Sequence, residues 1–262
     1  MEDEKIAEML EHENESWDRI FQAELAKDEE DREDFSSYWW ESYYSEITSF
    51  ILAQLSCFNA PTILEAGSGS GKGSLLLERD YRRTLLDISG SALEYAKYLA
   101  KRFGAENISY VQGNVFRMPF ESKSFDFVWN IGVVEHYEED GITRMVAEMA
   151  RVTAEGGLLA VAIPNFKSLP ILKASVLRNR FLKFIPGYRL DSEHGYSESQ
   201  MLEMIEAGVK KAGRSQQAPQ IVYFGSPLFM ESPKWLIRSL GKVMERFAPK
   251  SKFLMLILVK VQ

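Results

Sequence analysis

A glycine-rich loop between two apolar runs is the feature that most constrains how this chain folds. Residues 62–66 are mostly apolar, residues 67–73 contain four glycines, and residues 75–77 are leucines. This order predicts a strand, a tight turn and a helix. Glycines admit positive φ and close approach of a ligand, and a helix N-terminus offers unpaired N–H groups with partial positive charge. The stretch therefore predicts a site for a nucleotide-like cofactor, with a simple tight turn as the alternative.

The spacing of the loop residues separates different kinds of glycine-rich loop. A P-loop requires G-x-x-x-x-G-K-[ST], but Ala66 stands at the first glycine position and Gly73 at the hydroxyl position. A dinucleotide-binding loop requires G-x-G-x-x-G, and here Gly67 and Gly69 fit while Lys72 occupies the third glycine position. The loop matches neither pattern.

What remains is Glu65-x-Gly67-x-Gly69-x-Gly71. This pattern resembles motif I of the class I methyltransferases that depend on S-adenosylmethionine (SAM). The acid at the strand end could pair with the ammonium group of SAM. The resemblance implies that Glu65, Gly67, Gly69 and Gly71 hold the amino-acid part of the cofactor, with Ser68 in the same binding loop.

A second apolar run, residues 84–88, contains an acid near its end. Asp87 lies 20 residues after Gly67 and is followed by Ile88. An acid near this distance can accept hydrogen bonds from ribose hydroxyls at the tip of the next strand. The alternative places Asp87 in the N-cap region of the following helix, since Ser89 is also a capping residue type. Together with the loop, Asp87 and Ile88 are predicted to contact the cofactor.

Apolar runs and helical patterns then alternate along the chain. The expected strands are 62–66, 84–88, 107–112, 125–130, 158–163, 220–224 and 253–261, and the expected helices include 71–79, 91–103, 141–153 and 197–213. Such alternation predicts an α/β fold with a mostly parallel sheet, helices on both faces and ligands at the carboxyl ends of the strands. The resemblance implies a Rossmann-like methyltransferase fold with seven strands, the last antiparallel.

An acidic N-terminal segment and two basic insertions define the expected domain organisation. Residues 1–60 are predicted to form an acidic helical extension, and residues 61–262 a SAM-binding domain with cap insertions near 164–190 and 225–250. Both insertions are apolar and basic, and 164–190 contains no acid. They are expected either to pack as ordinary amphipathic helices or to cap the pocket of an anionic or amphiphilic substrate, with peripheral membrane contact as a further reading.

Charge and composition limit the partners. Residues 1–34 carry 15 acids against 4 basic groups, which predicts a solvated helix surface or a frayed arm and argues against nucleic acid at this end. The single cysteine and the acidic start of the sequence favour a cytoplasmic protein without disulfides, and no apolar run suits a transmembrane helix. The aromatic run at residues 35–44 fits either a core or a lid over a cofactor.

The third and fourth strands end in further candidate residues. In the methyltransferase family an acid after the third strand contacts adenine, and here Asn114 and Val115 take that position. The amide oxygen of Asn114 can still accept from an adenine amino group, although a turn role is the alternative. The resemblance places Asn130 and Ile131 beside the sulfonium end of the cofactor.

His136 is the candidate catalytic base. Methyl transfer to oxygen or nitrogen requires loss of the acceptor's proton, and histidine can take it near neutral pH. Glu135 could orient His136, while His194 is a second candidate, and an ordinary surface role remains the alternative for His136. No cluster of side chains has the spacing of a metal site.

The sequence therefore predicts a SAM-dependent methyltransferase that acts on a small molecule and leaves S-adenosylhomocysteine as product. The expected reaction is in-line attack on the methyl group, with the protein supplying alignment and a closed pocket. The alternatives are an oxidoreductase that binds NAD and a protein that binds SAM without catalysis.

Overall fold

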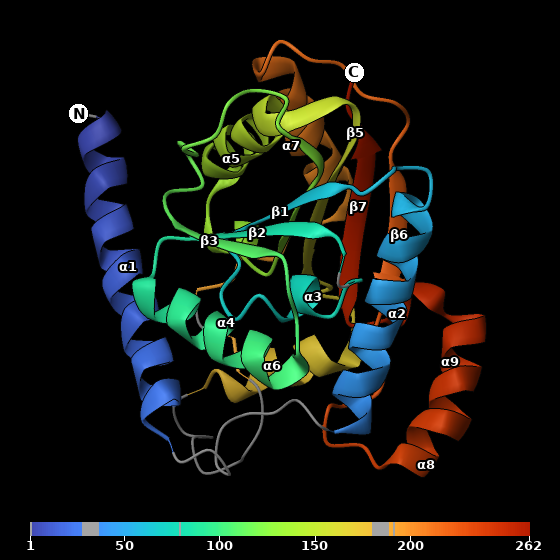
Figure 1. Cartoon of the computed structure of the whole chain (residues 1–262). Helices are drawn as coiled ribbons and strands as arrows, with labels where there is room; N and C mark the ends of the chain where they lie inside the picture. The colour runs from blue at the N-terminus through green and yellow to red at the C-terminus, as the bar shows by residue number, and fades with distance from the viewer. Residues whose placement is uncertain (1, 28–36, 79, 180–188, 191) are drawn as a thin grey trace.

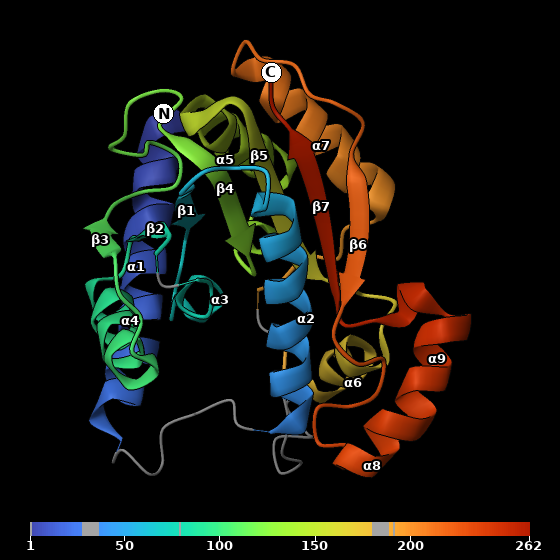
Figure 2. The ribbon, with the colours of Figure 1, turned by 45° about the vertical axis from the view of Figure 1, so that its right-hand side comes forward.

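A central twisted sheet carries helices on both faces (Figures 1 and 2). The computed structural model describes residues 2–27, 37–78, 80–179, 189–190 and 192–262. Seven strands are hydrogen-bonded in the order β3-β2-β1-β4-β5-β7-β6. They are β1 (Thr62–Ala66), β2 (Arg82–Asp87), β3 (Ile108–Gln112), β4 (Phe125–Ile131), β5 (Thr153–Pro164), β6 (Gln220–Phe224) and β7 (Leu254–Lys260).

Strand β7 runs against its neighbours. Strands β1 to β5 pair in parallel, whereas β7 pairs antiparallel with both β5 and β6. The predicted Rossmann-like sheet with an antiparallel last strand is confirmed. The carboxyl ends of the parallel strands, among them Ala66, Asp87 and Ile131, meet at one edge of the sheet, where this fold class binds its ligands.

Apart from α3, the predicted helices fall close to those of the structure. The helical segments are α1 (Glu2–Ala26), α2 (Tyr38–Leu55), α3 (Lys72–Leu75), α4 (Gly90–Phe103), η1 (Val134–His136), α5 (Glu139–Val152), α6 (Leu169–Leu177), α7 (Glu198–Lys211), α8 (Lys234–Leu236), η3 (Ile237–Gly241), α9 (Lys242–Phe247) and η4 (Pro249–Ser251). Local capping sets several ends: Ser197 and Gln200 form the capping box at the start of α7, and Gly104 ends α4 in a left-handed conformation.

The helix after the glycine loop is much shorter than predicted. The sequence predicts a helix over 71–79, but α3 ends at Leu75. The buried guanidinium of Arg83 donates to the backbone oxygens of Ser74 at 3.2 Å and Leu77 at 3.2 Å. An arginine of the next strand, β2, therefore satisfies carbonyl groups that another helical turn would otherwise have to pair.

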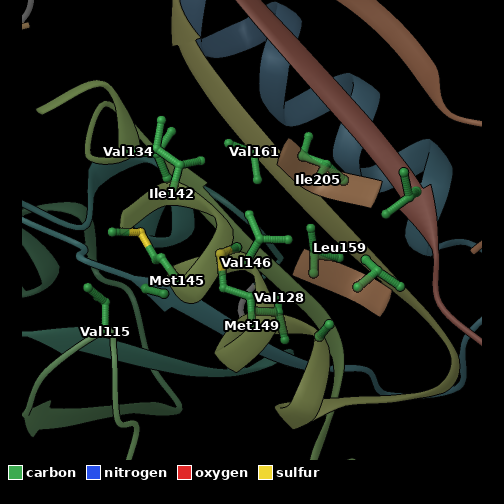
Figure 3. Close-up of a cluster of buried hydrophobic side chains, with 14 of the residues drawn as sticks. Val115, Val128, Val134, Ile142, Met145, Val146, Met149, Leu159, Val161 and Ile205 are labelled. Carbon is green, nitrogen blue, oxygen red and sulfur yellow. The ribbon is translucent and has the colours of Figure 1, made fainter. Parts of the chain in front are cut away.

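One face of the sheet packs against α5 and α7. Figure 3 shows this buried cluster, with Val128, Leu159 and Val161 from the sheet, Ile142, Met145, Val146 and Met149 from α5 and Ile205 from α7. All these side chains are at most 1% exposed. Their burial fixes α5 and α7 against β4 and β5, and so fixes the loop after β4 that contributes to the site.

The other face packs against α2. Trp39 and Tyr43 of α2 are buried, and Nε1 of Trp39 donates to the backbone oxygen of Leu228 at 2.9 Å. Trp40 and Tyr44, on the adjacent side of the helix, remain half-buried. The aromatic run is therefore core in part, and residues 35 and 36 of it lie outside the described residues.

The two basic insertions lie next to one another. Segment 164–190 forms α6, with residues 180–188 outside the described part, and segment 225–250 forms α8, η3 and α9, with η4 beginning at Pro249. Figure 2 shows α6 beside α8 and α9, and Lys173 of α6 is paired with Glu231 at 2.7 Å. In the part of the chain that the structure describes, no helix is long and apolar enough to span a bilayer.

A glycine in the α5–α7 interface gives a test of this packing. A Cβ added to Gly208 would lie 2.6 Å from Cβ of Val146 and 2.8 Å from the backbone oxygen of Thr143. We expect Gly208→Ala to lower the free energy of unfolding by about 1–3 kcal/mol, despite the better helix propensity of alanine. Denaturant unfolding measures this change.

Gly241→Ala is the matched control. Its added Cβ would meet nothing nearer than 3.4 Å, so alanine should be neutral or stabilise by up to about 1 kcal/mol. Equal stabilities of the two variants would contradict the tight α5–α7 contact.

Candidate active site

The glycine loop is held over the ends of β1 and β2 by backbone hydrogen bonds. The N–H groups of Gly67 and Ser68 both donate to the backbone oxygen of Leu86, at 2.8 and 2.9 Å. Gly67 has φ of 71°, and an added Cβ would lie 2.9 Å from a methyl group of Val133. Lys72, which would face phosphates in a P-loop, is buried with its Nζ 4.7 Å from the ring centre of Tyr44. The loop is therefore built for close approach of a ligand, without a phosphate-facing lysine.

Asp87 joins this loop to the end of β2. Its carboxylate accepts from the N–H of Gly69 at 2.7 Å and from the N–H of Ser89 at 2.9 Å. Burial raises the pKa of Asp87, and these backbone donors oppose the shift. Each carboxylate oxygen has two lone pairs, so both still have capacity for a ligand hydroxyl.

A cavity of about 220 Å³ opens beside the loop and Asp87. Most of the predicted cofactor residues line it, namely Gly67, Ser68, Gly69, Asp87, Ile88, Asn114, Val115 and Ile131, together with His136. The structure thus brings the ends of β1, β2, β3 and β4 into one pocket. Within it, the side-chain oxygen of Asn114 already accepts from the N–H of Phe116 at 2.7 Å, so adenine would have to share this acceptor or meet the amide nitrogen.

Three predicted cofactor residues lie outside the lining of this cavity. Glu65 accepts from the N–H of Ser74 at 3.2 Å, and burial raises its pKa to about 7. Gly71 is the N-cap of α3, and Asn130 donates to the backbone oxygen of Ala66 between β4 and β1. Their contact with the cofactor stays a prediction; in the structure, Glu65 and Asn130 hold backbone groups of the fold.

Helix α1 contributes cavity residues that the sequence did not predict. Glu13, Trp17 and Phe21 line the cavity, at successive turns of one helix. Asp18 accepts from the hydroxyl of Ser89 and from the N–H of Ser91 at 3.1 Å, which places its charge at the N-terminus of α4. The acidic segment was expected to be solvated or frayed, but this part of it covers the cavity.

A second cavity of about 440 Å³ adjoins the first. Both are lined by Glu13, Trp17, Ile131, Gly132 and His136, which form the wall between them. The rest of its lining includes aromatic side chains from α2 and from the residue just before β7, namely Trp40, Tyr43, Tyr44 and Phe253. Residues of the aromatic run thus face this second cavity rather than the first.

His136 stands at the junction of the two cavities. Its Nδ1 lies 2.7 Å from the hydroxyl oxygen of Ser192, and its ring meets Trp17 edge-on at a centroid distance of 5.5 Å. Two elements far apart in sequence therefore fix the orientation of the imidazole. His194, the other histidine considered, lines neither cavity and is exposed.

Glu135 is a buried carboxyl group at the wall of the second cavity. It is 2% exposed, and its Oε2 has no hydrogen-bond partner among the described residues. Burial raises the pKa of Glu135 to about 8. At neutral pH this group is therefore mostly a neutral acid. No three described His, Cys, Asp or Glu side chains are grouped so as to hold a metal ion.

Comparison with known proteins agrees with this arrangement. Residues 63–157 match the family model described as a methyltransferase domain. This segment belongs to the class I SAM-dependent methyltransferases. The match covers β1 to the first part of β5, which includes the glycine loop, Asp87, Asn114 and His136.

Curated relatives share this same region. The demethylmenaquinone methyltransferase of Lactococcus lactis is 38% identical over 88 residues, which is 34% of each chain. The fatty-acid O-methyltransferase of Mycolicibacterium smegmatis is 31% identical over 98 residues, which is 36% of this chain and 34% of the relative. The alignments thus span about a third of the length of these relatives.

Solved structures show the same fold over nearly the whole chain. The magnesium protoporphyrin IX methyltransferase of Synechocystis, solved with bound S-adenosylhomocysteine, is 13% identical with a TM-score of 0.57. The alignment covers 97% of this chain and 98% of that one. At this identity, the likeness to this structure shows the fold alone.

SAM is the cofactor of this domain, and the first cavity fits it. Asp87 offers an acceptor for ribose hydroxyls, the positive φ of Gly67 leaves backbone exposed to a ligand, and Trp17 and Phe21 supply apolar cover. Aromatic faces also attract a sulfonium cation.

Asp87 gives the first test of the site. We expect Asp87→Asn to weaken SAM binding by about 1–3 kcal/mol, because the loop loses a charged acceptor and the ribose a strong partner. Calorimetric titration with SAM measures the change. Asp126→Asn is the control: Asp126 accepts from the N–H of Thr62 at 2.8 Å, at the other end of the strands, and SAM affinity should not change.

Glu135 gives a prediction for pH. Its pKa is about 8 in the folded chain against an ordinary value of 4.5 for an exposed glutamate, so the folded state binds the proton more tightly. The unfolding free energy should therefore fall as pH rises between these values, by an amount on the order of a few kcal/mol. Glu135→Gln should reduce this fall, measured by denaturant unfolding at both ends of the range. The exposed Glu138→Gln is the control. If the unfolding free energy falls with pH as steeply in Glu135→Gln as in this control, the raised pKa does not belong to Glu135.

Proposed function

We infer that the protein transfers a methyl group from SAM to a small-molecule acceptor held in the second cavity. The observation that carries this inference is the common wall of the two cavities. Ile131, Gly132 and His136 line both, so a methyl group at the loop end of the first cavity would face an acceptor in the second. The protein's contribution is then to align the two reactants and keep water out.

The first cavity suggests how the cofactor would be held. Asp87 would accept from the ribose hydroxyls, and the backbone of Gly67 and Gly69 would lie along the amino-acid part. Asn114 and Val115 would contact adenine. Ile131 and Trp17 would flank the sulfonium end, where an aromatic ring favours positive charge.

Methyl transfer to oxygen or nitrogen needs a lone pair on the acceptor atom and a place for its proton. SAM supplies an activated methyl group, whose bond to sulfur breaks as the bond to the acceptor forms. His136 would take the proton of an O–H or N–H acceptor, because it borders both cavities and is held by Ser192 and Trp17.

The lining of the second cavity indicates the kind of acceptor. Its described residues include aromatic rings and the acids Glu13, Glu135 and Glu193, and they include no lysine or arginine. This composition favours an apolar or amphiphilic acceptor with a neutral or cationic polar end over an anionic one. A relative named for fatty-acid O-methylation supports the amphiphilic character of the acceptor but not its charge, because a fatty acid ends in a carboxylate.

Titration with SAM, S-adenosylhomocysteine, NAD and ATP, followed by turnover assays with methyl-labelled SAM, tests the proposal. We expect micromolar binding of the first two and label transfer to members of an amphiphilic and aromatic acceptor panel. Binding of NAD in place of SAM would support an oxidoreductase. Tight SAM binding without transfer to any acceptor would support a non-catalytic protein.

His136→Gln tests the assigned base. We expect turnover to fall by about 100-fold or more while affinity for S-adenosylhomocysteine changes little. The pH dependence of turnover should also lose its limb on the acid side, because that limb reports protonation of the base. His194→Gln is the matched control and should retain activity, since His194 borders neither cavity. Equal losses in both variants would contradict the role of His136.

A further inference from the structure

The helix at the rim of the molecule exposes large apolar side chains. Residues 234–247, formed by α8, η3 and α9 and called here the outer helix, lie at the edge of the structure in Figures 1 and 2. Trp235 is 69% exposed, Phe247 is 79% exposed, and Val243 is 53% exposed. The outer helix is anchored on its other side, where Ile237 and Gly241 are buried.

The exposed apolar side chains share one face of the outer helix. The segment η3 is a π-helical turn that directly follows α8, and its wider turn brings Leu240 of η3 toward the same side as Trp235 of α8. Val243 and Phe247 then follow at normal α-helical spacing. An apolar stripe on a solvent-facing helix of this length marks a contact surface.

Cations accompany the stripe. Lys234, Arg238, Lys242 and Arg246 recur every fourth residue, and all four are exposed. From residue 229 to 250 the chain has five cations and only two acids. Lys234 and Arg238 also stack on the ring of Tyr38, at 4.8 and 5.4 Å, which holds them at the surface.

Helix α6, from the other basic insertion, extends this surface. Leu169, Leu172 and Val176 of α6 are 38%, 48% and 63% exposed, at helical spacing. Lys173 joins the two insertions, with an ion pair to Glu231 at 2.7 Å and its Nζ 5.5 Å from the ring centre of Phe229. The two insertions therefore expose apolar groups in the same region of the molecule.

We propose that the outer helix docks on the surface of a lipid bilayer that contains anionic lipids. The apolar stripe would enter the boundary between headgroups and acyl chains, and the cations would lie among anionic headgroups. Charge complementarity favours this occupant over a second copy of the chain. A symmetric contact through this face would bring the cations of two copies together.

The outer helix also lies close to the second cavity. Helix α2 begins at Tyr38, whose ring contacts Lys234 and Arg238 of the outer helix. Later residues of α2 line the second cavity, namely Trp40, Tyr43 and Tyr44. A docked protein could thus receive an amphiphilic acceptor from the bilayer. This delivery rests on the proposed function, whereas the docking itself does not.

Co-sedimentation of the full chain with vesicles tests the docking. Phosphatidylcholine vesicles with and without phosphatidylglycerol are the probes. We expect binding to the anionic vesicles that weakens with added salt, and much weaker binding to the neutral ones. The double variant Lys242→Gln with Arg246→Gln should bind roughly tenfold or more weakly. Trp235→Ser with Phe247→Ser should lose binding while still binding S-adenosylhomocysteine.

A matched control removes two cations from another helix. Lys210→Gln with Lys211→Gln changes exposed lysines at the end of α7 and should leave vesicle binding unchanged. The proposal is overturned if the wild-type chain binds neither vesicle, or if the variants of the outer helix bind as well as the wild type. Concentration-dependent dimerisation that Trp235→Ser with Phe247→Ser abolishes would assign the face to a second copy instead. Vesicle binding needs no turnover, so its failure is distinct from failure of the methyl-transfer proposal.

Discussion

The hydrogen bond between the N–H of Gly69 and the carboxylate of Asp87 is the contact on which the site depends. It joins the loop after β1 to the end of β2, and the same carboxylate holds the N–H of Ser89 just before α4. A buried carboxylate is costly unless backbone donors meet it, and here two do. One side chain therefore organises the loop, the start of α4 and the floor of the first cavity.

The local pattern of apolar residues was enough to predict the strands of the sheet, but it did not predict the length of every helix. Strand residues such as Val128 and Leu159 are apolar because both faces of a parallel sheet are covered, and that signal is visible in sequence. The end of α3 is different, since it depends on Arg83 reaching the oxygens of Ser74 and Leu77. No local propensity encodes such a contact between segments.

The same division holds in the candidate site. Asp87, Gly67 and Gly69 were predictable as lining residues because each follows or ends a strand in a motif with a known spacing. Trp17 and Phe21 were not, because their place over the cavity depends on α1 packing against α4 through Asp18. Glu65 has the predicted motif position, and its carboxylate accepts from the N–H of Ser74 outside the lining of the cavity, so its contact with the cofactor stays a prediction.

Charge is distributed unequally between the side of the molecule that holds α1 and the side that holds the outer helix. The formal net charge of −7 would predict repulsion from an anionic surface, yet helix α1 alone carries nine acids against two basic groups. Helix α1 and the outer helix lie on opposite sides of the sheet in both views (Figures 1 and 2). An anionic bilayer would therefore repel one side and attract the other, and this charge asymmetry would turn the outer helix toward the lipid before any apolar contact forms.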